Sequence, residues 1–333
     1  MRNVDTIIIG GGPAGASCAG ELVRAGRDVL VLDRARFPRE KLCAGWITEK
    51  VMRDLDFTPQ SYPNGILPLK IRTHVPKLPF GLSFFPTPGA NYSIRRVEFD
   101  AWLLARSGAP VETHAVKEIL RDGDGFVIDG QYRCRHLVGA GGTMCPVRRS
   151  FFPDTRKRRD QIVTLEREFD YPARPGLCRL YFFRRGLSGY SWYVPKADGV
   201  VNIGIGGKAN WFRRQDTTIH DHLKYFLADL HRDGLLDAQT VDGFRAHGHP
   251  YYVAGAAPPP RADNVWLAGD AAGLASVDLG EGIGPAIESG QMIAAEIAGA
   301  GRLDTGRLTR YSTSGLVRKL AAKTLDRRPA PAA

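Results

Sequence analysis

Cysteine is scarce and scattered in this chain of 333 residues. The five cysteines form no CxxC pair and no repeating spacing. Such a set is typical of free thiols in a reducing compartment and argues against a disulfide framework. The two HxH pairs, His220/His222 and His247/His249, have no cysteine or carboxylate beside them at metal-ligand spacing. We therefore expect no metal site, and structural or solvated roles for these histidines.

Long apolar runs are also missing. The sequence has no stretch of about 18 apolar residues, so we expect no membrane-spanning helix. No signal peptide is predicted, because residues 1–6 lead directly into a strand and a glycine loop. The expected location is the cytoplasm, and peripheral contact with a membrane stays open.

Acidic residues are fewer than basic ones: 35 Asp and Glu stand against 46 Lys and Arg, which gives a net charge of +11. This balance favours an anionic partner such as a dinucleotide, a phosphorylated substrate or an acidic membrane face. The densest basic run, Arg156–Arg159, is predicted to be a solvated loop. No nucleic-acid-binding motif accompanies the charge, so no nucleic-acid partner is expected.

The order of the predicted elements indicates an α/β protein. Residues 4–9 read as a buried strand, a glycine turn and an amphipathic helix follow, and residues 28–33 read as a second buried strand. From about residue 160 to 255, β-rich runs dominate, with one helix near 219–233. We therefore expect a Rossmann-like dinucleotide-binding domain with an inserted, sheet-rich substrate domain. The predicted limits are 1–60, 90–155 and 255–305 for the first domain, 61–89 and 156–254 for the second, and 306–333 for a C-terminal helix and disordered tail.

Glycines at 10, 12 and 15 form a GxGxxG motif, which is weak by itself because glycine is frequent here. Its context strengthens it: a strand precedes it, a helix follows, and Asp33 closes the second strand. Gly12 lets a pyrophosphate approach the backbone, the helix N-terminus attracts phosphate, and Asp33 is placed for the adenosine ribose. The cofactor-binding residues predicted from this unit are Gly10, Gly12, Pro13, Ala14, Gly15, Asp33 and Arg34.

Two later segments bear on which dinucleotide is expected. VWLAGDAAG at 265–273 and GEGIGPAIESG at 280–290 resemble the second FAD-binding signature of the p-hydroxybenzoate-hydroxylase-like flavoproteins. The resemblance implies that Asp270 binds the ribityl chain. It also implies that a helix opening at Gly282 and Ile283 points its amides at the flavin pyrimidine, where reduced flavin carries negative charge. Gly269 and Gly280 belong to the same signature.

Three further pieces match that family. Arg96, three residues before Phe99, occupies the position of a flavin-contacting arginine, and Val116, on the predicted strand 110–116, that of a residue at the adenine. LVGAGGTMCPVRR corresponds to a GADGxxSxVR stretch, with Gly141 in place of aspartate and Cys145 in place of serine. Gly141 is still expected near the cofactor. The change disfavours an aromatic hydroxylase and leaves the electron donor open, whether NAD(P)H or another donor.

Within these flavoproteins, two segments resemble the geranylgeranyl reductases. FPREKLCAGWIT at 37–48 is similar to their cysteine-containing loop near the flavin, which implies that Cys43 and Ala44 contact it. GYSWYVPKADGVVNIGIG at 189–206 is similar to their YxWxFPKxxxxxxG box, which lines the hydrophobic substrate cavity. The resemblance makes Cys43, Tyr190 and Trp192 the candidate catalytic residues, although Tyr190 and Trp192 also suit ordinary packing on one face of a strand.

The sequence thus predicts an FAD-dependent oxidoreductase that reduces carbon–carbon double bonds of a hydrophobic, isoprenoid-like small molecule. An acid, either Cys43, a tyrosine or water, would protonate the second carbon. The alternatives are a flavin monooxygenase and a flavin-dependent halogenase, whose WxWxIP motif resembles YSWYVP. A non-enzymatic electron-transfer module that docks on a donor protein is the third.

Overall fold

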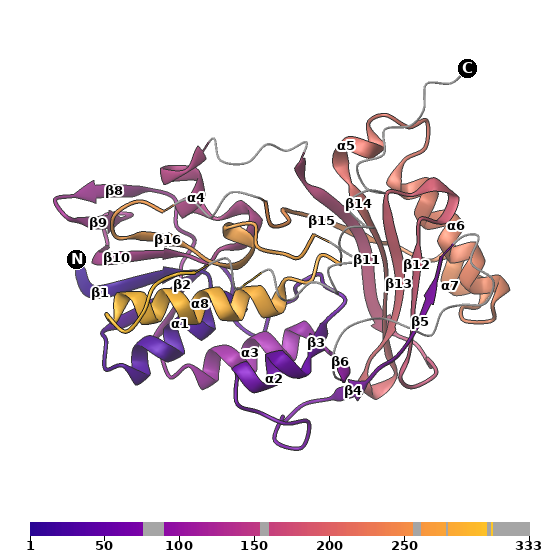
Figure 1. Cartoon of the computed structure of the whole chain (residues 1–333), viewed down its shortest axis with the longest axis horizontal. Coiled ribbons are helices and arrows are strands. Elements are labelled where there is room, and N and C mark those ends of the chain that lie inside the picture. The colour runs from indigo at the N-terminus through magenta and orange to yellow at the C-terminus, as the bar shows by residue number, and fades with distance from the viewer. Residues whose placement is uncertain (76–89, 154–159, 256–260, 278, 305–307, 309–333) are drawn as a thin grey trace.

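The structure is a computed structural model that describes residues 1–75, 90–153, 160–255, 261–277, 279–304 and 308. Two units lie along the long axis of the molecule (Figure 1). One is an α/β unit with a seven-stranded sheet, and the other is built on a six-stranded sheet. The basic run 156–159 and the predicted C-terminal helix and tail lie outside the described residues, apart from Leu308.

The seven-stranded sheet begins with the predicted strand–helix–strand unit. Strands β1 (Arg2–Ile9) and β2 (Val29–Asp33) are parallel neighbours joined by helix α1 (Pro13–Arg24). The strand order is β7-β2-β1-β10-β9-β8, and β16 pairs with β10. The other strands are β7 (Val111–Thr113), β8 (Ile119–Asp122), β9 (Gly125–Ile128), β10 (Tyr132–Gly139) and β16 (Val265–Leu267).

Both faces of this sheet are covered, because alternate residues of its strands point to opposite sides. Ile8 and Val31 face a core formed with α1, α3 (Arg96–Arg106) and α8 (Ile283–Ile297). Ile7 and Leu30 face a second core, which includes residues of α4 (Pro146–Phe151). The helices α1 and α8 run side by side beneath the sheet in Figure 1.

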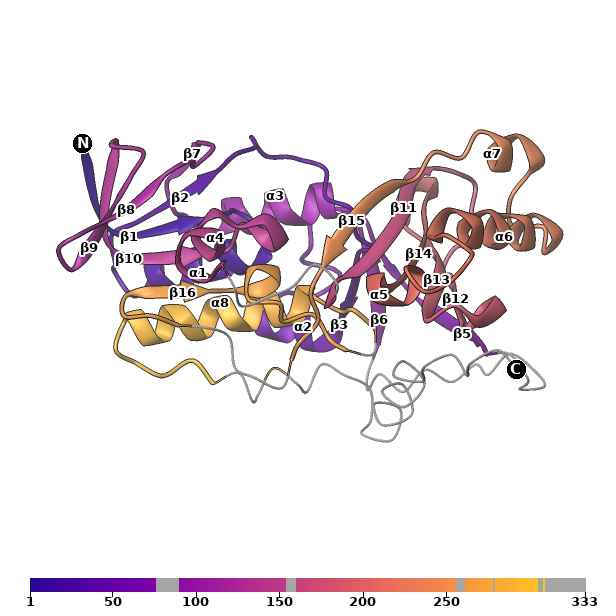
Figure 2. The same ribbon diagram turned by 90° about the horizontal axis from the view of Figure 1, so that it is seen from above.

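The six-stranded sheet has the order β15-β11-β14-β13-β12-β5, with every pair antiparallel except β12–β5. One face packs on α6 (Ile219–Arg232) and α7 (Ala238–Asp242), which lie at the far end of the molecule in Figure 2. The opposite face turns toward the α/β unit. Its strands are β5 (Lys70–His74), β11 (Ile162–Asp170), β12 (Leu177–Phe182), β13 (Gly189–Pro195), β14 (Val200–Lys208) and β15 (His247–Tyr251).

A small three-stranded sheet joins the two units. It consists of β3 (Trp46–Thr48), β6 (Asn91–Ile94) and β4 (Ile66–Pro68), with α2 (Glu49–Asp54) directly after β3. The described residues also form shorter helices: η1 (Gly142–Met144), η4 (Arg184–Gly186), η5 (Ala197–Gly199), α5 (Ala209–Phe212) and η6 (Gly269–Ala271).

The predicted fold class, an α/β Rossmann-like unit with a sheet-rich second unit, is confirmed. The exact domain limits stay a prediction. One local expectation was wrong: strand β7 ends at Thr113, so Val116 lies in the loop that follows it. The Asp129 carboxylate accepts hydrogen bonds from the backbone N–H groups of Lys117 and Glu118, which holds this segment as a loop instead of a strand.

Candidate active site

A cavity of about 760 Å³ lies between the α/β unit and the inward face of the six-stranded sheet. Its lining includes the residues that follow the carboxyl ends of β1, β2 and β10, at Gly10, Arg34 and Ala140. In parallel α/β sheets this edge is where ligands bind. Strands β11, β13 and β15 close the cavity from the other side with Glu166, Trp192 and His249.

The turn between β1 and α1 depends on close backbone approach. Gly10 has φ +111°, and a Cβ there would lie 2.4 Å from the carbonyl oxygen of Ala140. A Cβ on Gly15 would lie 1.8 Å from the carbonyl oxygen of Gly10, so α1 can start this close to β1 only without a side chain. Gly12 is the N-cap of α1 and lines the cavity, where the helix amides favour an anion.

Asp33 stands at the end of β2 with its side chain buried against the glycine turn. Its Oδ2 accepts a hydrogen bond from the Gly11 backbone N–H at 2.7 Å, and its Oδ1 accepts one from Ala35 at 2.9 Å. These bonds fix the carboxylate at the cavity wall, where the sequence predicts the ribose.

Two arginines share one buried carboxylate beside the turn. Arg96 donates to Asp100 through Nε at 2.7 Å and Nη2 at 2.8 Å, a bidentate pair one turn apart on α3. Arg39 Nη1 lies 3.4 Å from Asp100 Oδ2, and its guanidinium covers the Phe37 ring at 4.6 Å. Both arginines line the cavity, so Asp100 holds two cations near the glycine turn between β1 and α1. Arg39 was not among the predicted site residues.

The N-terminus of α8 closes the cavity from the α/β side. Asp270, Gly280, Gly282 and Ile283 all line it. Glu281 Oε1 accepts a hydrogen bond from the Gly284 backbone N–H at 2.7 Å, which satisfies one amide of the first turn.

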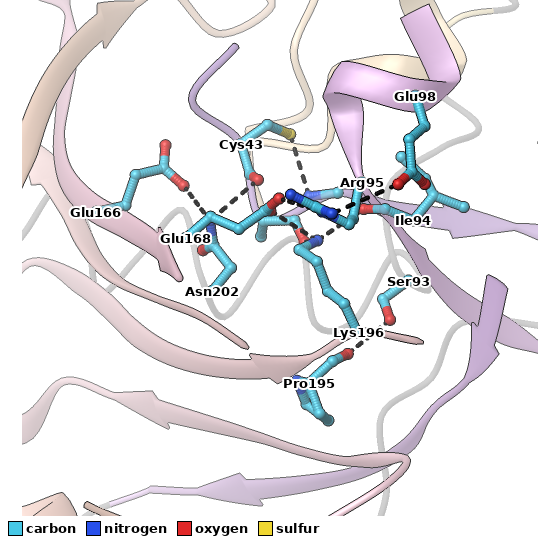
Figure 3. Close-up of polar contacts among 12 residues, drawn as sticks. Cys43, Ser93, Ile94, Arg95, Glu98, Glu166, Glu168, Pro195, Lys196 and Asn202 are labelled. Carbon is cyan, nitrogen blue, oxygen red and sulfur yellow. Dashed lines mark hydrogen bonds and ion pairs between the residues drawn. The ribbon is translucent and has the colours of Figure 1, made fainter. Parts of the chain in front are cut away.

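The cysteine loop is fastened to the six-stranded sheet by a buried lysine (Figure 3). Lys196 Nζ donates to the carbonyl oxygens of Ala44 and Ile94, each at 2.7 Å, and lies 3.5 Å from Glu168 Oε2. Burial lowers the pKa of Lys196, while the Glu168 carboxylate opposes this shift. The lysine of the YxWxFPK-like box therefore positions the loop that carries Cys43.

Among the aromatic residues that line the cavity, Trp46, Tyr190 and Trp192 belong to one apolar cluster, and we call these three the aromatic wall. The Trp46 Nε1–H donates to Asn91 at 2.9 Å and the Trp192 Nε1–H donates to Asn202 at 2.7 Å, so both indole donors are satisfied within the protein. Gly204 makes room for this wall, because a Cβ there would lie 2.4 Å from Trp192 Cζ2.

Four polar residues that sequence reasoning missed also line the cavity: Lys41, Glu166, His249 and Tyr251. Lys41 Nζ and His249 Nε2 lie 2.7 Å apart. Burial and the charge of Lys41 lower the pKa of His249 to about 4, so its neutral ring accepts this hydrogen bond. Burial raises the pKa of Glu166 to about 7, although the Asn202 amide and the Lys41 charge oppose the shift. The expectation that His249 is merely structural or solvated missed its place in the cavity.

Comparison with known proteins identifies the family. A family model described as an FAD binding domain matches residues 3–58. An uncharacterized protein of Methanosarcina barkeri is 32% identical over 320 residues, which cover 89% of this chain and 75% of the relative. Digeranylgeranylglycerophospholipid reductase 3 of Methanosphaera stadtmanae is 29% identical over 324 residues, 90% of this chain and 78% of the relative. The chain belongs to the geranylgeranyl reductase-like family of FAD-dependent oxidoreductases.

A solved structure shares the fold. The geranylgeranyl bacteriochlorophyll reductase-like protein of Thermoplasma acidophilum superposes with a TM-score of 0.73 at 21% sequence identity, covering 97% of this chain and 83% of that one. Among the described residues of this flavoprotein, no helix is long and apolar enough to cross a bilayer.

The geometry of the cavity of this flavoprotein is suited to FAD. The open face of Gly12, the fixed carboxylate of Asp33 and the N-terminus of α8 are groups that suit a pyrophosphate, a ribose and an anionic flavin ring. Of the predicted site residues, all but Gly15 and Gly269 line the cavity. Gly15 packs α1 on β1, and a Cβ on Gly269 would meet Ala286 and Ala14 at 3.1 and 3.2 Å. The individual roles of these residues stay predictions.

Proposed function

We propose that this flavoprotein reduces carbon–carbon double bonds in the isoprenoid chain of a hydrophobic substrate. The observation that carries the proposal is one cavity that contains both the glycine turn and the aromatic wall. The name of the Methanosphaera relative points to the same substrate class, since the reducible groups of a geranylgeranyl chain are its double bonds. Burying such a chain against the aromatic wall contributes up to about 0.8 kcal/mol per methylene.

Bound in its reduced form, FAD supplies the hydride for this reaction. The chain's own residues hold and surround it. We propose that Gly12 and Arg39 take the pyrophosphate, that Asp33 takes the adenosine ribose, and that Asp270 takes the ribityl chain. The N-terminus of α8 stabilises negative charge on the flavin by about 0.3–2 kcal/mol.

The three candidate catalytic residues take different parts in this proposal. The Tyr190 hydroxyl donates a hydrogen bond to the Leu279 carbonyl oxygen. Its ring therefore serves the aromatic wall together with Trp192. Cys43 Sγ accepts a hydrogen bond from the Gly45 backbone N–H at 3.4 Å, which orients the thiol within its loop. We assign Cys43 to contact with the flavin.

Product analysis tests the proposed function. The purified yellow protein would be reduced with dithionite under anaerobic conditions and incubated with geranylgeranyl diphosphate or a geranylgeranylated phospholipid. We expect products that are heavier by two hydrogens for each double bond reduced. A hydroxylated product and peroxide, formed only when NAD(P)H and air are supplied, would overturn this proposal in favour of a monooxygenase, and a chloride-dependent product would indicate a halogenase.

The remaining predictions concern the surroundings of the enzyme. NAD(P)H or a protein as electron donor, peripheral membrane contact and a cytoplasmic location stay predictions. Parallel assays with NADH, NADPH and dithionite test the electron donor. Activity with dithionite alone would mean that the donor is neither NADH nor NADPH.

A further inference from the structure

Glu166 is the most deeply buried carboxyl on the cavity wall. Its relative exposure is 2%, and it lies on β11, directly opposite Gly204 of β14. A Cβ built on Gly204 would touch both Trp192 Cζ2 at 2.4 Å and Glu166 Cβ at 2.6 Å, so Glu166 and Trp192 flank the same glycine. The carboxyl group therefore lies beside the aromatic wall, where the isoprenoid chain is proposed to bind.

One oxygen of Glu166 is held by the protein and the other is not. Asn202 Nδ2 donates to Glu166 Oε2 at 3.2 Å and to the Cys43 carbonyl oxygen at 3.3 Å, while Asn202 Oδ1 accepts from Trp192. Oε1 accepts no hydrogen bond from the residues that the structure describes. Figure 3 shows it pointing away from Asn202. Asn202 thus links the cysteine loop, the aromatic wall and the carboxyl group.

We propose that Glu166 is the proton donor of the reduction, an inference that rests on the proposed function. The Glu166 O–H proton would form one new C–H bond, while a hydride supplied by bound, reduced FAD would form the other on the neighbouring carbon. The π bond would break, the reduced flavin would supply the electron pair, and the Glu166 carboxylate would take a proton from water before the next turnover. This assignment replaces Cys43, a tyrosine or water as the acid.

Burial allows Glu166 to hold a proton near neutral pH, although its cationic neighbours oppose this. Lys41 from the cysteine loop and Lys196 from the end of β13 favour its carboxylate form, whereas Glu168 on β11 disfavours it. Tyr251 and His249 of β15 face the same space, and His249 stays neutral there. Burial dominates this balance and raises the pKa of Glu166 to about 7.

Single-turnover kinetics with the holoenzyme test the inference. The flavin is reduced anaerobically, mixed with a geranylgeranylated phospholipid, and its reoxidation is followed across pH. In the wild type we expect the rate to fall about tenfold for each pH unit above about 7. Glu166→Gln should be slower by about 10²–10⁴-fold at pH 6 and independent of pH, with flavin content and lipid affinity retained. Asp170→Asn, an exposed carboxyl on the same strand, is the matched control and should behave like the wild type.

A second readout does not depend on turnover. Infrared spectra of the holoenzyme should show a protonated-carboxyl band that disappears above neutral pH and is missing in Glu166→Gln. A variant that keeps the wild-type rate and its pH dependence would overturn the role of Glu166 and leave the proposed function intact. A wild-type flavin that never reacts with the lipid would overturn both.

Discussion

The two ends of the cavity are built in different ways. The end that carries the glycine turn depends on backbone: the turn itself, a helix N-terminus and a carboxylate fixed by two amides, with Arg39 and Arg96 beside them. The substrate end is made of side chains, with the aromatic wall and Glu166 contributed by separate strands. A backbone site tolerates few changes at its glycines, whereas a side-chain site can be altered residue by residue. This difference makes the two ends separable by mutation.

The largest effect is expected at the nucleotide end. Gly15→Ala places a Cβ 1.8 Å from the Gly10 carbonyl oxygen, which backbone atoms cannot avoid without moving α1. We expect a loss of about 3 kcal/mol or more in the free energy of unfolding, together with loss of FAD. Chemical denaturation and flavin absorbance measure both. Gly20→Ala, in the same helix but in ordinary contact at 3.4 Å, is the control and should be neutral or slightly stabilising.

The second prediction concerns Glu166 and the pH dependence of the free energy of unfolding. Burial raises the pKa of Glu166 to about 7 in the folded protein, whereas in the unfolded chain this carboxyl has its ordinary pKa of about 4.5. The folded state therefore binds more protons between these values, and the free energy of unfolding falls as pH rises through that window. Glu166→Gln should remove up to about 3 kcal/mol of this fall. If the free energy of unfolding had the same pH dependence in the wild type and in Glu166→Gln, the raised pKa of Glu166 would be contradicted.

These two predictions also show what could be foreseen from the sequence. The glycine turn and Asp33 lie in one short continuous segment, so strand–turn–helix order predicted them. The α8 signature is also continuous, but it was predicted from its resemblance to a family of flavoproteins. Glu166 and His249 reach the same cavity, and Asn202 reaches Glu166, only through the pairing of β11 with β14 and β15. In the sequence Glu166 looks like any polar residue on an alternating strand. Only the pairing of the strands shows that it shares a face of the sheet with Trp192.

A smaller effect should separate the two ends more cleanly. Gly204→Ala places a Cβ 2.4 Å from Trp192 and 2.6 Å from Glu166, so the aromatic wall has to move. We expect a loss of about 2 kcal/mol in stability and weaker lipid binding, with FAD retained. Flavin content and lipid titration report the two properties separately. Gly248→Ala on β15, with its nearest contact at 3.6 Å, should leave both unchanged.

The smallest effect is expected at Gly12, where a substitution should weaken FAD binding without lowering stability. A Cβ on Gly12 meets nothing closer than Arg39 Nη2 at 3.4 Å, so Gly12→Ala should fold with wild-type stability. The methyl group nevertheless occupies the approach of the pyrophosphate, and we expect FAD affinity to fall about tenfold, or roughly 1.4 kcal/mol. Titration of the apoprotein with FAD measures this. Unchanged affinity would mean that the pyrophosphate lies elsewhere.

The central claim is that one cavity joins an FAD site to an isoprenoid site. Stopped-flow mixing of the anaerobically reduced holoenzyme with two phospholipids, one geranylgeranylated and one with saturated phytanyl chains, tests it most directly. The account predicts that the flavin is reoxidised only by the unsaturated lipid, in step with the disappearance of double bonds. Reduced flavin that ignores both lipids and reacts only when air is admitted would contradict it.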